Sequence, residues 1–331
     1  MGNNVERTNL EPTNPEAYSI KSQCIEQSSL ASVTRLQVSV IIPVFNDSES
    51  LQRCLLALAK QTYARDLFEV VIVDNNSSED IAGVVDKFAR FGVVHEPKVG
   101  SYAARNRGIS SSRGEVIAFT DSDCIPEPDW IENGVKALTS APGIGQVVGK
   151  VSLIYQQSQP NSIELYDELL MGFPQQRFVE EQHYGATANV FTFRSVINKV
   201  GTFNDSLKSI GDFEWGNRVF AAGYSQVYSA EAEVAHPARS KFSQIYKKTI
   251  RITGGIQDLQ KQEGSSSLSD FSRSFLHDLM PPFRFTFEIF SKPELSFKQK
   301  LDVVLLRFTF KQIRAWENLR LRFGRGDSYR G

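Results

Sequence analysis

The segment GEVIAFTDSD, residues 114–123, decides how this chain folds. It contains an apolar run from Val116 to Phe119, which is typical of a strand that is covered on both faces. The run ends at Asp121 and Asp123, two carboxylates with one residue between them. Like charges at that spacing repel each other, so the end of this strand requires a partner for them.

Strand-like and helical segments alternate along the first half of the chain. VSVIIPVFN (38–46) and EVVIVD (69–74) are apolar runs of strand length. The stretches that follow them, residues 47–61 and 78–91, are each predicted to be a helix. A short strand at 92–96 and a helix at 101–112 then lead into the strand that ends at Asp123. This rhythm predicts an α/β fold with a mostly parallel, Rossmann-like central sheet and helices on both of its faces.

Polar clusters follow three of these strands. NDS comes after the first strand, DNNSS after the second, and DSD after the last. In sheets of this kind, ligands bind beyond the carboxyl ends of the strands. The clusters therefore predict a binding site at one edge of the sheet.

The composition is that of a globular protein without a general affinity for nucleic acid. The chain has 331 residues, of which 41% are apolar, and a net charge of −1. Its three cysteines, Cys24, Cys54 and Cys124, are widely spaced, which favours neither a disulfide framework nor a cysteine metal site and fits a reducing, cytoplasmic setting. We find no signal-peptide pattern and no apolar run near the ~20 residues of a membrane-spanning helix, so we expect a chain that does not cross a bilayer.

Two explanations account for Asp121 and Asp123 on spacing alone. Aspartates often cap the turn that follows a strand. Alternatively, the pair binds a divalent cation, Mn²⁺ or Mg²⁺, because these ions prefer hard oxygen ligands. Such ions usually bridge to phosphate groups, so the second explanation implies a phosphorylated substrate.

Four motifs, VSVIIPVFN, EVVIVDNNS, GSYAARNRG and GEVIAFTDSD, occur in an order and at a spacing that resemble family 2 glycosyltransferases. The resemblance extends over roughly residues 38–251. It implies the GT-A fold and the transfer of a sugar from a nucleotide-sugar, a UDP-sugar foremost, to a hydroxyl acceptor with inversion at the anomeric carbon. It also implies a role in the synthesis of a polysaccharide, glycolipid or other glycoconjugate.

The resemblance assigns roles to residues at matching positions. Those that contact the donor are Pro43, Phe45, Asn46, Asp74, Arg105, Asn106 and Asp121. Those that bind the divalent metal are Asp121, Asp123 and His236. Those that serve proton transfer, in the acidic motif SIGDFEWGNR, are Asp212 as the base and Glu214 as its alternative. Those that border the acceptor are Asn189 and Trp215.

Several of these residues also have a structural explanation. Asp74 is a common turn former, and the family more often carries two acidic residues and a glycine where this chain has DNN. Asp212 suits a helix N-terminus whether or not it is catalytic. A lone histidine such as His236 is often structural, and a tryptophan such as Trp215 is at least as often part of the core.

The chain divides into three predicted regions. Residues 1–35 are polar and form a flexible N-terminal tail. Residues 36–255 form the GT-A catalytic domain, with a nucleotide-sugar-binding half at 36–125 and an acceptor-binding half at 126–255. Residues 256–331 form a C-terminal amphipathic helical extension.

The C-terminal extension is dense in Phe, Lys and Arg. Leu301, Val304, Leu305 and Phe308 share one face of a predicted helix. A basic amphipathic helix of this kind can lie in a membrane interface, which would place the protein at the inner face of the membrane. The alternative is a helix that packs on the catalytic domain or on a partner subunit.

A second function, from a different class, also fits the resemblance. A non-catalytic, nucleotide-sugar-binding protein could serve as a membrane-associated assembly factor, but it would be expected to lose its base or its metal pair. Because Asp121, Asp123, Asp212 and His236 are all present, the enzyme is favoured. A nucleotidyltransferase would carry a Gly-rich, basic loop after the first strand, and PVFNDSES has none.

Overall fold

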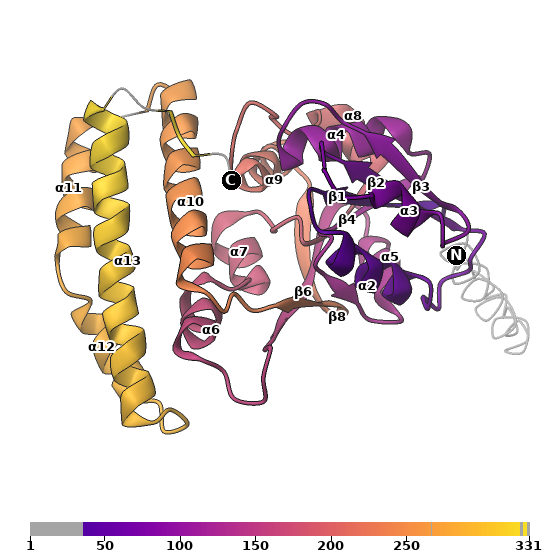
Figure 1. The fold of residues 1–331 in the computed structure, drawn as a ribbon. Coiled ribbons are helices and arrows are strands. Elements are labelled where there is room, and N and C mark those ends of the chain that lie inside the picture. Colours follow the sequence, from indigo (N-terminus) through magenta and orange to yellow (C-terminus); the bar gives the residue numbers. More distant parts are fainter. Residues whose placement is uncertain (1–35, 266, 325–326, 330–331) are drawn as a thin grey trace, which may run out of the picture.

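The computed structural model describes residues 36–265, 267–324 and 327–329. The predicted tail at 1–35 lies outside the described residues. Figure 1 shows two parts: a domain built around a β-sheet, and a group of long helices beside it. We call this group, α10 to α13, the helical lobe.

The described strands form one sheet in the order β3-β2-β1-β4-β7-β6-β8-β5. Their bounds are β1 Val38–Val44, β2 Phe68–Asp74, β3 Phe91–His95, β4 Val116–Thr120, β5 Ile125–Pro126, β6 Ile144–Ile154, β7 Asn189–Phe193 and β8 Ser225–Pro237. β1 to β4 are parallel, β7 is antiparallel to both β4 and β6, β8 is parallel to β6, and β5 is antiparallel to β8. The prediction of a mostly parallel sheet is confirmed.

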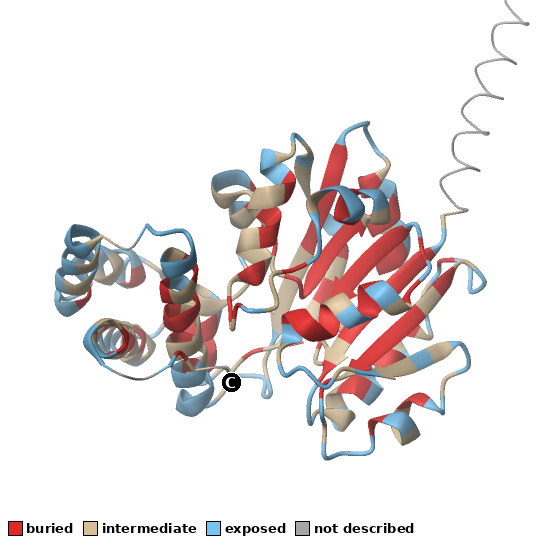
Figure 2. Cartoon of the chain, turned by 90° about the horizontal axis from the view of Figure 1, so that it is seen from above, coloured by how far each residue is buried: buried red, intermediate tan, exposed pale blue. Residues whose placement is uncertain are grey.

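Helices cover both faces of the sheet, as predicted (Figure 2). Their bounds are α2 Ser48–Leu58, α3 Ile81–Val85, α4 Ser101–Ser111, α5 Trp130–Leu138, α6 Ser162–Tyr166, α7 Gln175–Gln182, α8 Arg194–Val200 and α9 Gly211–Ala221, with a π-helix, η1, at Asp167–Met171. Ile41 and Ile42 of β1 belong to different core clusters because consecutive strand side chains point to opposite faces. Ile42 packs in the cluster that holds Trp130, and Ile41 packs in the one that holds Trp215.

One predicted helix is much shorter than its sequence pattern. The pattern extends over residues 78–91, but α3 covers only Ile81–Val85. Its start is fixed by Asp80, whose side chain accepts a hydrogen bond from the backbone N–H of Gly83 at 2.9 Å. The preceding residues 75–80 form a polar loop beside the end of β1.

The helical lobe begins earlier than predicted. Its elements are α10 Phe242–Gln262, α11 Leu268–Leu279, α12 Phe283–Phe290 and α13 Phe297–Phe323. The predicted boundary between residues 255 and 256 is wrong because it falls inside α10. The pair Gly254-Gly255 resembles a helix end, but it serves close packing: a Cβ on either glycine would lie 2.8 Å from Ser328 or Ser209.

Candidate active site

A cleft of about 670 Å³ opens at the carboxyl ends of β1 and β4. Segments from distant parts of the chain line it, including the turns after β1 and β4, helix α4, the start of α9, the end of β8 and one side of α10. Its volume is in the range of pockets that bind small molecules and cofactors. The sequence predicted a site at this edge of the sheet, and the structure confirms that a cleft lies there.

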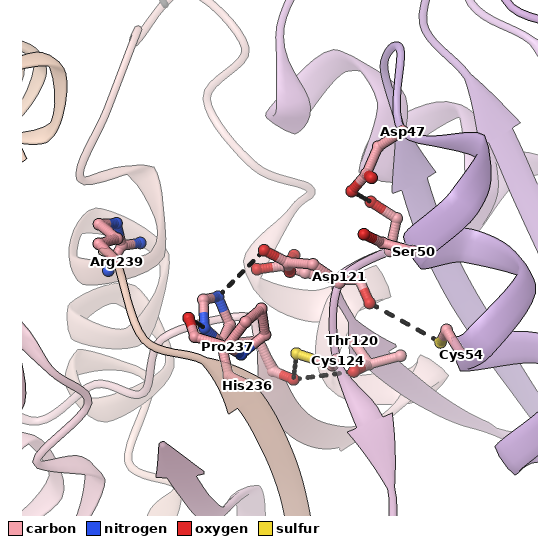
Figure 3. Close-up of polar contacts among 12 residues, drawn as sticks. Asp47, Ser50, Cys54, Thr120, Asp121, Cys124, His236, Pro237 and Arg239 are labelled. Atoms are coloured by element: carbon pink, nitrogen blue, oxygen red, sulfur yellow. Dashed lines mark hydrogen bonds and ion pairs between the residues drawn. The ribbon is translucent and has the colours of Figure 1, made fainter. Parts of the chain in front are cut away.

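Asp121 and Asp123 face different partners in this cleft. Asp121 accepts a hydrogen bond from the guanidinium of Arg105, whose side chain is 5% exposed. Asp123 faces the imidazole of His236, with 3.3 Å between Oδ2 and Nε2. Figure 3 shows His236 at the end of its strand, beside the segment that carries Asp121. The structure thus separates the two charges that the sequence places together.

The orientation of His236 is set by its other ring nitrogen. Nδ1 lies 2.8 Å from the carbonyl oxygen of Pro237, which can only accept a hydrogen bond, so Nδ1 carries a proton. In the neutral ring, Nε2 then presents a lone pair toward the carboxylate of Asp123. These two groups repel each other unless a proton or a cation lies between them. A metal-binding histidine typically shows this arrangement, with its second nitrogen donating to a backbone carbonyl.

The charges around Asp123 also favour a cation at this position. Burial raises the pKa of the Asp123 carboxyl, the neighbouring Asp121 and Asp47 raise it further, and His236 opposes the shift. In the described part of the chain, no group of three or more His, Cys, Asp or Glu side chains is arranged to hold a metal by itself. Asp123 and His236 therefore fit a divalent ion that takes its remaining ligands from water and phosphate oxygens, as Mg²⁺ usually does.

Asp212 lies in the first turn of α9 and is held by two hydrogen bonds. Its Oδ1 accepts from the hydroxyl of Tyr102 at 3.3 Å and from the backbone N–H of Phe213 at 3.1 Å. The Tyr102 hydroxyl itself accepts from the N–H of Gly211 at 2.8 Å. Burial raises the pKa of the Asp212 carboxyl, and Arg105 opposes that shift. A carboxylate with a raised pKa is suited to accept a proton.

The backbone before Asp212 is strained. Ile210 has a φ of 56°, in the left-handed region that β-branched residues rarely adopt. Strain of this kind costs on the order of 1–3 kcal/mol and is most often found at functional sites. Here it turns the chain into α9 so that Asp212 lines the cleft.

Seven of the thirteen predicted site residues line the cleft. They are Pro43, Phe45, Arg105, Asp121, Asp123, Asp212 and His236. They come from five separate segments of the chain, which the fold brings together in one cleft.

The predicted acceptor residues are buried in the core, which contradicts their assignment. Asn189 is 0% exposed, and its side chain bonds Trp130 and two backbone carbonyls. Trp215 is 1% exposed and donates its indole N–H to the carbonyl of Gly201 at 2.9 Å. The core explanation therefore holds for Trp215, and the same explanation extends to Asn189.

Glu214 and Asn106 are also engaged away from the cleft. Glu214, the alternative base, forms a two-point ion pair with Arg218, at 2.6 and 3.0 Å. The amide of Asn106 bonds both the carbonyl and the N–H of Phe203, at 2.8 and 3.0 Å. These partners use the polar atoms that the predicted roles would need.

Asn46 and Asp74 shape the loops beside the cleft and do not line it. Asn46 accepts a hydrogen bond from the N–H of Ser78 at 2.8 Å. Asp74 accepts one from the N–H of Ser77 at 2.9 Å, which is the turn-forming role that was its alternative. The next residue, Asn75, lines the cleft in its place.

Two cations of α10 line the cleft and were missed by the sequence motifs. Lys248 donates to the backbone carbonyl of Met171, and burial together with Arg239 lowers its pKa to about 7. Arg251 lies one turn further along α10. Both follow the last motif of the resemblance, so no spacing rule singled them out. Tyr102, which bonds Asp212, lies inside the motif GSYAARNRG, but the sequence analysis assigned it no role.

Comparisons with known proteins identify the family of this chain. The model of the glycosyl transferase family 2 matches residues 39–201. The chain is 35% identical over 223 residues to glycosyltransferase AglE of Haloferax volcanii, a match that covers 66% of this chain and 72% of that protein.

Two solved structures share the fold. The mannosyltransferase PcManGT from Pyrobaculum calidifontis, in complex with GDP-Man and Mn²⁺, aligns with a TM-score of 0.52 at 18% identity, over 88% of this chain and 76% of that one. S. aureus TarS 1–349, in complex with UDP-GlcNAc, aligns with a TM-score of 0.50 at 18% identity, over 88% and 74%. Together, the motifs, the GT-A-like fold and the extent of the AglE match show that this chain belongs to glycosyltransferase family 2.

Proposed function

We propose that this protein is an inverting, metal-dependent glycosyltransferase that moves a sugar from a nucleotide-sugar, a UDP-sugar foremost, to a hydroxyl acceptor in polysaccharide, glycolipid or glycoconjugate synthesis. One observation carries the proposal. A single cleft brings a half-buried carboxylate, Asp212, together with the Asp123–His236 pair, although these residues come from both halves of the chain. A base and a cation site in one cleft are the two parts that such a reaction needs.

The cation site would be formed by Asp123 and His236, with Asp121 nearby. Carboxylate oxygen and imidazole nitrogen suit Mn²⁺, and oxygen ligands suit Mg²⁺. When bound, the ion supplies positive charge that stabilises the departing diphosphate. The Mn²⁺ in the PcManGT complex supports this use of the fold.

The chain's own residues perform the rest of the reaction. Asp212 accepts the proton of the acceptor hydroxyl as its oxygen forms a bond to the anomeric carbon. The bond between that carbon and the diphosphate oxygen breaks, and the nucleoside diphosphate leaves with the bonding electrons. Attack from the face opposite the leaving group inverts the anomeric centre in one displacement. Arg239 and Lys248 line the cleft and can offset charge on the phosphates.

Tyr102 keeps Asp212 in position for this step. Its hydroxyl donates to Oδ1 of Asp212 and accepts from the N–H of Gly211, so the ring, the helix start and the carboxylate are joined. A Cβ at Gly211 would lie 2.8 Å from the Tyr102 ring, so glycine is required for this approach. For the donor, Phe45 offers an exposed ring at the cleft that can stack on a nucleobase.

The test is donor hydrolysis by purified protein across UDP-, GDP- and dTDP-sugars, with Mn²⁺, with Mg²⁺ and with EDTA. We expect nucleotide release from one donor, abolished by EDTA and by Asp123→Ala. The matched control is Asp270→Ala, a substitution of an exposed aspartate in α11 that should leave the rate unchanged. Nucleotide binding without metal dependence and without turnover, in the presence of candidate acceptors, would favour the non-catalytic assembly factor.

A further inference from the structure

The helical lobe exposes an unusual number of large apolar side chains. Of the twenty-one large apolar residues that are exposed in the described chain, thirteen lie in residues 268–323. They are Leu268, Leu276, Leu279, Met280, Phe283, Phe287, Phe290, Phe297, Leu301, Leu305, Phe308, Trp316 and Phe323. In Figure 2 the outer side of the lobe, at the left of the view, is largely pale blue. A patch of this kind marks an interaction surface.

Six of these residues form an apolar stripe along helix α13. Phe297, Leu301, Leu305, Phe308, Trp316 and Phe323 recur at helical spacing along its 27 residues, a length of about 40 Å. The opposite face of α13 is already used for packing. There, Phe310 contacts the rings of Tyr166 and Phe242 at 5.1 and 4.8 Å between centroids. The stripe is thus a second apolar face, beyond the one that holds the lobe together.

The charges of the lobe are unequal. Residues 268–323 contain ten Lys and Arg against six Asp and Glu. Two of those acids, Asp278 and Glu317, are tied into ion pairs with Arg314 and Arg320. Lys311 is buried and donates to the carbonyl of Met280, while Arg284 and Lys298 are exposed. The lobe thus has an excess of four positive charges, in a chain whose net charge is −1. Phe, Trp and Leu beside Lys and Arg form the surface that lies in the interface of an anionic membrane.

We infer that the outer face of α11, α12 and α13 binds the surface of a bilayer that contains anionic lipid. The helices would lie in the interface, since none of the helices within residues 36–265 and 267–324 is long and apolar enough to cross a membrane. Docking would hold α10, and with it Lys248 and Arg251 in the cleft, close to that surface. This last consequence rests on the proposed function, while the binding itself does not.

The experiment is flotation of the full chain with vesicles. Vesicles of phosphatidylcholine mixed with phosphatidylglycerol should carry the protein upward, and vesicles of phosphatidylcholine alone should carry much less. Raised salt should weaken the binding. The triple variant Phe287→Ser, Phe297→Ser and Trp316→Ser should lower the partition by at least about tenfold. These side chains are 79%, 71% and 63% exposed, so the substitutions spare the core.

Two further variants sharpen the result. Arg284→Glu with Lys298→Glu should remove the preference for anionic vesicles. Leu56→Ser with Ile154→Ser, exposed apolar positions of the sheet domain, should leave flotation unchanged. No flotation with either vesicle would overturn the inference. So would a triple variant that floats normally but changes from dimer to monomer by light scattering, because a second copy would then cover the stripe. Neither result depends on sugar transfer.

Discussion

The sheet domain and the helical lobe use the same kinds of residues in opposite ways. In the sheet domain the large aromatic residues point inward: Trp130 is 0% exposed and Trp215 is 1% exposed. In the lobe, Trp316 is 63% exposed and Phe287 is 79% exposed. The charges differ as well: Asp121, Asp123 and Asp212 of the domain line the cleft, while the lobe has ten Lys and Arg against six Asp and Glu. Large aromatic residues such as these therefore belong to the core in the sheet domain and to an exposed surface in the helical lobe.

The largest difference between the two regions should appear in the free energy of unfolding when a tryptophan of each is replaced by alanine. Trp130→Ala removes a fully buried side chain that packs on Phe191, so we expect a loss of about 3–5 kcal/mol in the free energy of unfolding. Trp316→Ala should change it by no more than about 0.5 kcal/mol, because that ring is exposed. Chemical denaturation measures both. Equal losses would show that the lobe buries its stripe in solution.

The next effect concerns the metal requirement of turnover and tests the Asp123–His236 pair. His236→Ala removes the imidazole that faces Asp123, and we expect the Mn²⁺ concentration for half-maximal turnover to rise by at least about tenfold. His277→Ala, at an exposed position of α11, is the control and should leave it unchanged. Titration of turnover with Mn²⁺ provides the measurement. An unchanged metal requirement in His236→Ala would exclude this histidine as a ligand.

These effects show how much the sequence could predict. The alternating strands, the cleft edge and the Asp121 and Asp123 positions all follow from short-range patterns that the fold preserves. Asn189 was mispredicted because a motif identifies a residue but not the side of the strand to which it points. Lys248 was missed because its place in the cleft depends on how α10 packs, which is a long-range contact with no local pattern.

A smaller, pH-dependent effect should come from Lys248. Its pKa is lowered to about 7, so the ammonium is charged below that pH and becomes neutral as the pH rises through it. Affinity for a phosphate-bearing substrate should therefore fall by a few-fold as the pH rises through about 7. In Lys248→Met this pH dependence should vanish. Calorimetric titration with the nucleotide at several pH values measures this affinity. A wild-type affinity that does not change with pH would show that Lys248 makes no contact with the phosphates.

The smallest effect should come from Tyr102→Phe. The hydroxyl of Tyr102 stabilises the ionised form of Asp212 and so lowers the pKa of that carboxyl, against the larger effect of burial. The base works when ionised, so turnover should fall as the pH drops through this pKa. Without the hydroxyl the pKa rises further, and the acidic limb of the rate profile should move to higher pH. A limb that moves to lower pH, or stays in place, would contradict the positioning role.

The central claim is that Asp212 is the base and that its near neighbour Glu214 is not. The most direct measurement is turnover and donor affinity, determined side by side, for Asp212→Asn and Glu214→Gln. We predict that Asp212→Asn lowers turnover by about 10²–10⁴-fold while the donor still binds, and that Glu214→Gln, in its ion pair with Arg218, stays near wild type. Wild-type turnover in Asp212→Asn, with or without a loss in Glu214→Gln, would contradict the account.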